Sequence, residues 1–383
     1  MDVRTTDFSA ARTAMERYVD QEIIPGVSWA VLRGHEVVDQ QCVGFADREA
    51  KAALRPDHIF RAFSNTKIFV TSSIMLLVEE GRIGLDDPVE KFLPQLGNRK
   101  VLKQGAASLA DVEPAKSPIT IRQLLTHTSG LVAVNEPGPA DYPFMKNQIA
   151  VGVVGAMGYR NMNYGLCRIL ISTIDAPFLF DLLPTVDDNY WDLTTIRYYQ
   201  RYVQENVFDP AGVTSTFAMA PDQALAYEFP VNARGKDAGD LSTMSGAVGW
   251  RLSVDDLLAV MASFRRLGTM VDPARAQIML DRGFGIDQVR RTPLGLVYAK
   301  GGFWSFEKGT FVQQTNAIFL PKSMELAILA NSPLCTPDTG FMDRVLDAIE
   351  RNIHLRLATL TVTAVAAFAL AGLVRHVRAP RRP

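Results

Sequence analysis

Apolar residues near the two ends of this chain occur in short runs that are typical of strands. The runs Val27–Leu32 and Glu36–Val43 flank Arg33-Gly34-His35, and this pattern predicts a β-hairpin. Late in the chain, similar runs predict three more strands, at Leu294–Lys300, Thr310–Leu320 and Glu325–Ala330.

Helical spacing dominates between these strands. Apolar positions and end signals predict helices from Ser64 to about Glu80, after the capping box Thr120-Ile121-Arg122-Gln123, over Asn163–Ile174 and Asp192–Val207, and finally over Phe341–Ile353. We therefore expect an α+β fold, with an antiparallel sheet built from both chain ends and flanked by helices. A mostly helical subdomain is expected at about 85–240, inserted in a domain of residues 1–353, with a ligand cleft between the two parts.

Composition narrows the functional classes. The chain has 383 residues and a formal net charge of -1, so no overall positive field favours nucleic acid. Its three cysteines lack a C-x-x-C spacing, which predicts reduced interior thiols rather than a disulfide framework. The five histidines include no H-E-x-x-H pair, and neither a metal nor a cofactor is expected. Nothing in the sequence indicates an oligomeric state.

The C-terminal region differs in kind from the rest. Leu357–Val374 carries no charged residue, and residues 375–383 form a basic tail. As a helix the uncharged segment would span roughly 27 Å, close to the thickness of a bilayer core. It is interpreted as a single-pass membrane anchor or as an apolar tail packed on the domain. No signal peptide is seen at the N-terminus, so the expected location is cytoplasmic or membrane-associated through this segment.

A Ser-x-x-Lys motif lies where an apolar strand gives way to an apolar helix. Ser64 and Lys67 are one helical turn apart and share a face. A serine hydroxyl becomes a good nucleophile when a base takes its proton, and a buried lysine with a lowered pKa can be that base. The same pattern also fits a capped helix with an ordinary surface lysine.

Two further stretches carry polar groups suited to the same chemistry. Tyr159 and Asn161 lie two residues apart just before a helix, and a phenol next to a lysine can relay a proton while an amide positions its neighbours. Lys300, Gly301, Gly302 and Phe303 follow at a strand end, where glycines would let a substrate backbone lie close to the sheet edge. Read singly, these stretches also fit a turn and a hairpin corner.

With these three motifs in this order, the chain resembles the serine β-lactamase and penicillin-binding-protein superfamily. The resemblance is to its class C β-lactamase-like branch, which includes family VIII carboxylesterases, and it covers roughly Phe8 to Ile353. Ile119–Leu131 (ITIRQLLTHTSGL), Val89–Pro94 and Asn206–Val213 also look like segments of that branch.

The resemblance implies a serine hydrolase that works through an acyl-enzyme. Ser64 would be the nucleophile and Lys67 its base or proton relay. Tyr159 would be the partner base and later the proton donor, and Asn161 would position both lysine and substrate. Lys300 would complete the cationic end, and the N–H groups of Ser64 and Phe303 would form the oxyanion hole. His127–Ser129 is expected to be a supporting turn.

Two departures from the family pattern bear on the substrate. Lys300-Gly301-Gly302 stands where the usual motif is Lys-Thr-Gly, so a hydroxyl that would hold a substrate carboxylate is missing. Asp175–Trp191 is an apolar and aromatic insertion that is interpreted as a lid, a packing segment or a membrane contact. We expect a small-molecule ester or amide substrate and a carboxylesterase-like activity. A β-lactamase, a D-amino-acid peptidase, an acyltransferase and a non-catalytic ligand-binding module stay open as alternatives.

Overall fold

The structure, a computed structural model, describes residues 8–332 except 21–23, 95–99, 103–111, 115–117, 134–148, 152–153, 179–187, 216, 218, 230, 232, 238, 293–294 and 307–310. The predicted helix Phe341–Ile353, the uncharged segment Leu357–Val374 and the basic tail lie outside these residues, as does most of the Asp175–Trp191 insertion. Among the described helices, none is both long enough and apolar enough to cross a membrane.

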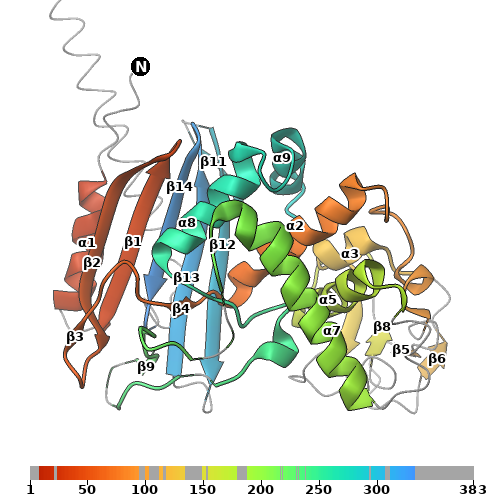
Figure 1. Ribbon diagram of the computed structural model, residues 1–383, viewed down its shortest axis with the longest axis horizontal. Coiled ribbons are helices and arrows are strands. Elements are labelled where there is room, and N and C mark those ends of the chain that lie inside the picture. The colour runs from red at the N-terminus through yellow and green to blue at the C-terminus, as the bar shows by residue number, and fades with distance from the viewer. Residues whose placement is uncertain are drawn as a thin grey trace, which may run out of the picture.

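An antiparallel sheet built from both ends of the chain forms the centre of the fold (Figure 1). In the described part of the chain it has eight strands in the order β11-β12-β13-β14-β1-β2-β3, with β9 paired to β13. The strands are β1 (Gly26–Arg33), β2 (Glu36–Asp47), β3 (Ala52–Ala53), β9 (Tyr227–Glu228), β11 (Gln288–Thr292), β12 (Gly295–Phe306), β13 (Phe311–Leu320) and β14 (Met324–Ala330).

The two chain ends meet where β1 pairs with β14. Their antiparallel register places Trp29 opposite Ile328 and Val31 opposite Leu326. The predicted hairpin is confirmed, because β1 pairs with β2 across a turn in which Gly34 takes a positive φ of 61°. The expected α+β architecture is therefore correct, and β12 is longer than the predicted strand because its pairing with β13 extends to Phe306.

Helices cover both faces of this sheet. On one face α1 (Ser9–Asp20) packs against β1 and β2, and a core forms from side chains that include Phe8, Trp29 and Ile318. On the other face lie α8 (Val254–Ala262), α9 (Pro273–Asp281) and the long buried helix α2 (Thr66–Glu79), which belong to the larger core (Figure 1). Burial of this much apolar surface is the main source of the stability of the fold.

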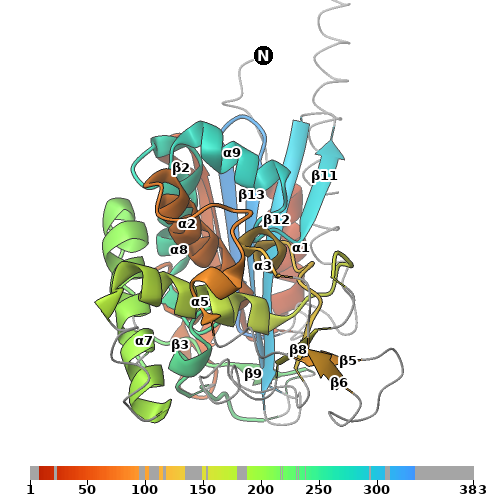
Figure 2. The same ribbon diagram turned by 90° about the vertical axis from the view of Figure 1, so that its right-hand side faces the viewer.

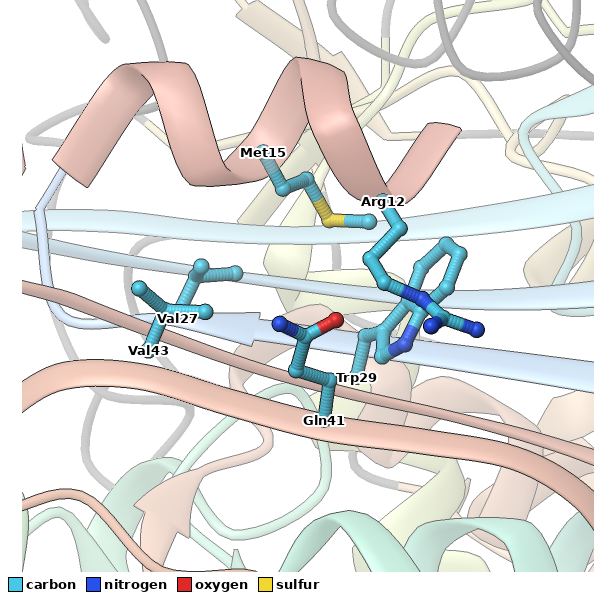
Figure 3. Close-up of a pocket in the computed structure, with 6 residues that line it drawn as sticks. All are labelled: Arg12, Met15, Val27, Trp29, Gln41 and Val43. Carbon is cyan, nitrogen blue, oxygen red and sulfur yellow. The ribbon is translucent and has the colours of Figure 1, made fainter. Parts of the chain in front are cut away.

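A small cavity lies between α1 and the sheet, on the face away from α2. Figure 3 shows the residues that line it, which are Arg12, Met15, Val27, Trp29, Gln41 and Val43. Its volume is about 10 Å³, enough for roughly one water molecule. This cavity is therefore too small to be a substrate site.

The remaining helices pack beyond α2, where α5 and α7 contact α2 and α3 contacts α5. These are α3 (Ile121–Leu125), α5 (Asn161–Asp175) and α7 (Asp188–Val203), the last continued by a π-helical turn, Gln204–Phe208. In Figure 2, α5 lies between α7 and a small sheet that the sequence did not predict. That sheet has the order β6-β5-β8-β7, with β5 (Lys100–Leu102), β6 (Val112–Pro114), β7 (Leu131–Ala133) and β8 (Ile149–Val151).

The start of α3 and the end of α2 lie at the residues that the sequence predicts. Thr120 accepts a hydrogen bond from the Gln123 N–H at 3.2 Å, and the Gln123 side chain accepts one from the Thr120 N–H at 3.0 Å. This reciprocal pair is the capping box at the start of α3. Helix α2 ends before Gly81, whose φ of 71° suits a glycine and few other residues.

Candidate active site

Ser64 lies in a single 3₁₀ turn, Phe63–Asn65, between β4 (Phe60–Arg61) and α2. The turn is attached to the central sheet, because Thr315 on β13 donates to the Ala62 carbonyl and accepts from the Asn65 amide, both at 2.9 Å. Phe63 is buried with a positive φ of 42°, an uncommon conformation for an aromatic residue. The α-helix itself begins at Thr66 rather than at Ser64, but the expected one-turn separation from Lys67 is kept.

Lys67 is completely buried and points its amine at the serine. Its Nζ lies 3.1 Å from Ser64 Oγ, 2.9 Å from Asn161 Oδ1 and 3.0 Å from the Ala247 carbonyl oxygen. Burial lowers the pKa of Lys67 well below its usual range, and the nearby Lys300 cation lowers it further. A neutral amine has two N–H donors and one lone pair. In the neutral form, Asn161 and Ala247 would accept the two protons and the lone pair would be left for Ser64 Oγ, whereas in the charged form a third N–H donates to Ser64 Oγ.

Tyr159 reaches the serine from the loop that precedes α5. Its hydroxyl lies 2.8 Å from Ser64 Oγ, and its ring centroid is 5.0 Å from Lys67 Nζ and also 5.0 Å from Lys300 Nζ. Burial raises the pKa of the Tyr159 phenol. The group is therefore a neutral phenol at neutral pH, which suits it to give a proton rather than to take the first one.

His127 holds the Tyr159 loop in place. Its ring stacks against the Tyr159 ring at a centroid distance of 4.4 Å, and its Nδ1 accepts from the Arg160 N–H at 3.2 Å. Burial lowers the pKa of His127 to about 3, and the positive charge of Lys300 lowers it as well. A neutral imidazole that contacts Tyr159 and not Ser64 fits the supporting turn expected from the sequence, which Ser129 extends by donating to Asn163 at 2.6 Å.

Lys300 is 1% exposed and lies on β12, the strand that packs directly against the Ser64 turn. Its Nζ donates to Asp287 Oδ1 at 2.5 Å. Burial lowers the pKa of Lys300, whereas the Asp287 carboxylate raises it. Lys300 therefore forms an ion pair with Asp287 inside the site, which the sequence did not predict.

Strand β12 presents an open edge beside the Ser64 turn. β11 pairs only with Gly295–Ala299, so that the later residues of β12 have β13 as their sheet partner within the described residues. The Gly301 N–H turns away from β13 and donates to Asp287 Oδ2 at 3.0 Å. N–H directions alternate along a strand, so the Phe303 N–H, two residues on, points to the same open edge.

Gly302 is required by close packing and not by contact with a substrate. A Cβ at this position would lie 2.3 Å from Thr315 Oγ1 and 2.6 Å from the Ala62 carbonyl oxygen, both far inside van der Waals contact. At Gly301 the nearest atoms to such a Cβ would be at 3.7 Å, which is ordinary contact. The sequence-based explanation of both glycines as room for a substrate is thus replaced, at Gly302, by close approach of β12 to the Ser64 turn.

Gly302→Ala is expected to separate β12 from this turn. We expect the free energy of unfolding to fall by about 1–3 kcal/mol, the usual cost of overpacking, and esterase activity to fall with it. Gly301→Ala is the matched control and is expected to change stability by less than about 1 kcal/mol. Equal melting temperatures for the two variants, measured by circular dichroism, would contradict this account of the glycine pair.

Sequence reasoning missed two groups at this site. The Ala247 carbonyl has no side-chain signature, and only the folded path of the chain brings it to Lys67. Asp287 lies 13 residues before Lys300 in sequence. The register of β11 with β12, which pairs Gln288 with Ala299, is the signal that would have placed Asp287 beside Lys300.

The site is open to solvent on one side. Ser64 is 7% exposed, whereas Tyr159 and Phe303 are 40% and 52% exposed. Two surface hollows of about 480 and 540 Å³ lie elsewhere, one beside α7 and one near Phe92, and neither is lined by Ser64. Within the described ranges, no group of three or more His, Cys, Asp or Glu side chains could hold a metal ion.

Comparison with known proteins agrees with this fold. Esterase EstB from Burkholderia gladioli is 34% identical over 129 residues, which cover 33% of this chain and 30% of EstB. Among solved structures, EstCE1 superposes with a TM-score of 0.66 at 18% identity, over 89% of this chain and 98% of that one. The class C beta lactamase from Rhodobacter sphaeroides gives 0.60 at 18% identity, over 90% and 99%.

The two structural likenesses show the fold, and the sequence match to EstB is partial. This chain spans about a third of the length of the first curated relatives that it matches. The model of the beta-lactamase family, in contrast, matches residues 11–338, which is most of the chain. The chain therefore belongs to the beta-lactamase family, as its motifs predict.

Proposed function

We propose that this protein is a serine hydrolase that cleaves small-molecule esters through an acyl-enzyme on Ser64. The observation that carries the proposal is the environment of the Lys67 amine. It is buried, its pKa is lowered, and its Nζ lies 3.1 Å from Ser64 Oγ, with Asn161 and Ala247 as its two other acceptors. When neutral, an amine in this position can take the serine proton, and the lowered pKa favours the neutral form.

The proposed reaction uses the side chains of Lys67 and Tyr159, which both contact Ser64 Oγ. Ser64 Oγ attacks the ester carbonyl while its proton passes to Lys67 Nζ, and the resulting oxyanion is held by the N–H groups of Ser64 and Phe303. Tyr159, 2.8 Å from Ser64 Oγ, gives its proton to the leaving alkoxide as the ester bond breaks. The proton on Lys67 then restores the phenol. Water attacks the acyl group by the same route in reverse, which releases the acid and reprotonates Ser64.

Several features favour an ester over a β-lactam or a peptide. The hydroxyl that would hold a substrate carboxylate is absent at Gly301, and the exposed apolar side chain of Phe303 follows two residues later on β12. The similarity to Esterase EstB and to EstCE1, which is described as a hydrolase with promiscuous acyltransferase activity, supports an esterase-like branch. Burying a lysine next to a serine costs free energy, and a module that only binds a ligand would not need this arrangement.

The substrate class is tested by comparing kcat/KM for p-nitrophenyl acetate and butyrate with values for a chromogenic cephalosporin and for D-alanine p-nitroanilide. We expect the esters to be hydrolysed at least about tenfold more efficiently, with acyl transfer to added methanol as a minor reaction. Faster turnover of the cephalosporin or of the anilide would contradict the ester assignment. Methanolysis that exceeds hydrolysis at low methanol concentration would show an acyltransferase instead.

A further inference from the structure

A carboxylate of the protein itself fills the cationic end of the site. Asp287 directly precedes β11, and its own N–H donates to the Ala299 carbonyl at 3.0 Å, which places it opposite Lys300. Its two oxygens accept separately, Oδ1 from Lys300 Nζ at 2.5 Å and Oδ2 from the Gly301 N–H at 3.0 Å. A lysine together with a strand-edge N–H is a donor pair well suited to one carboxylate. Asp287 occupies both donors.

This ion pair lies within reach of a substrate bound to Ser64. Lys300 Nζ is 5.0 Å from the centroid of the Tyr159 ring, and the Tyr159 hydroxyl contacts Ser64 Oγ. Tyr159 is the proton donor to the leaving group in the proposed reaction, and we infer that this group lies on the Lys300 side of the Tyr159 ring. The Asp287 side chain is 36% exposed, so its charge is accessible from solvent.

We propose that Asp287 determines specificity by excluding leaving groups that carry a carboxylate and favouring uncharged ones. The inference rests on the proposed esterase function and adds the class of leaving group. An anionic substituent would find the Gly301 N–H already bonded and the charge of Lys300 already paired, and it would lie against a like charge. That repulsion costs binding free energy in the ground state and the transition state. The missing hydroxyl at Gly301 alone would only remove an attraction, whereas Asp287 adds a repulsion.

Gly301 offers an independent check on this distinction. A Cβ there would lie 3.7 Å from Asp287 Oδ2 and 3.7 Å from Asn316 Oδ1, which is ordinary contact, so the backbone leaves room for a side chain at this position. The hydroxyl of a threonine introduced there could donate a hydrogen bond to the Asp287 carboxylate, and would then not be available to a substrate carboxylate. We therefore expect Gly301→Thr to give no preference for anionic substrates while Asp287 is present, and to increase that preference once Asp287 is replaced.

The test compares kcat/KM for phenyl acetate and 3-carboxyphenyl acetate, which differ by one carboxylate on the leaving group. We expect the wild type to prefer phenyl acetate, and Asp287→Asn to shift the ratio at least about tenfold toward the anionic ester, as removal of a near like charge predicts. Asp287→Ala should shift it in the same direction and guards against a defect particular to the Asn variant. The control is Asp222→Asn, which removes an exposed carboxylate paired with Arg55 and should leave the ratio unchanged.

The outcomes separate the possible roles of Asp287. Equal loss of activity on both esters, with the ratio unchanged, would show that Asp287 only holds Lys300 in place and would overturn the inference. A ratio that shifts with Gly301→Thr alone would assign the specificity to the missing hydroxyl instead. No turnover of phenyl acetate by folded wild type would contradict the proposed hydrolysis itself, and the specificity inference would fall with it.

Discussion

Replacing Lys67 by methionine is expected to lower kcat/KM for p-nitrophenyl acetate at neutral pH by about 10²–10⁴-fold, the usual contribution of a general base. Methionine keeps the volume of the buried side chain and removes the amine that faces Ser64 Oγ at 3.1 Å. Lys91→Met, which removes an exposed lysine paired with Asp87, is the control and should keep full activity. A Lys67→Met variant that folds and retains more than about a tenth of wild-type activity would rule out Lys67 as the base.

The lowered pKa of Lys67 also predicts how the free energy of unfolding depends on pH. Its pKa is lower in the folded protein than in the unfolded chain, so between the folded value and about 10.5 the unfolded chain binds more protons. The free energy of unfolding of the wild type should therefore rise with pH in this window relative to that of Lys67→Met. Urea denaturation of both proteins across this range measures the difference. Parallel curves would mean that Lys67 keeps an ordinary pKa.

Tyr159→Phe is expected to lower kcat/KM by a similar factor of about 10²–10⁴. The substitution keeps the ring that stacks on His127 and removes only the hydroxyl that lies 2.8 Å from Ser64 Oγ. Loss of the proton donor should be felt most with poor leaving groups. We therefore expect a larger loss for ethyl butyrate than for p-nitrophenyl butyrate, whose leaving group needs little protonation.

Tyr164→Phe is the matched control for Tyr159. The centroid of the Tyr164 ring lies 5.5 Å from Lys67 Nζ, compared with 5.0 Å for the Tyr159 ring. The Tyr164 hydroxyl, however, donates to the Leu125 carbonyl at 2.9 Å and not to Ser64. This variant should lose stability, because a buried carbonyl loses its donor, and keep most of its activity. Equal kinetic losses in the two variants would show that Tyr159 acts through packing.

The part of the site that follows from local spacing could be predicted from the sequence. Ser64 and Lys67 are one turn apart in any helical conformation, and the Thr120 capping box is a local pattern that the structure reproduces. Tyr159 and Lys300 are separated from Ser64 by long stretches of chain, and their meeting was expected only through the family resemblance. The structure brings them together, with Tyr159 in direct contact with Ser64 and Lys300 next to the Tyr159 ring.

What could not be predicted depends on strand register and on backbone groups. Asp287 joins the site through the pairing of β11 with β12, and a shift of one residue would turn its side chain to the other face of the sheet. The Ala247 carbonyl and the crowding at Gly302 arise from the path of neighbouring segments. The small sheet of β5–β8 has strands of only three residues each, too short to give a periodic pattern.

The most direct test of this account is to locate the acyl group. Wild type and Ser64→Ala are each incubated with a fluorophosphonate probe and with p-nitrophenyl butyrate, quenched in acid, digested and analysed by mass spectrometry. We expect an adduct on the peptide that contains Ser64, together with ester turnover, and neither in Ser64→Ala. Folded wild type with no adduct and no turnover, or an adduct on another residue that persists in Ser64→Ala, would contradict the assignment of Ser64 as the nucleophile.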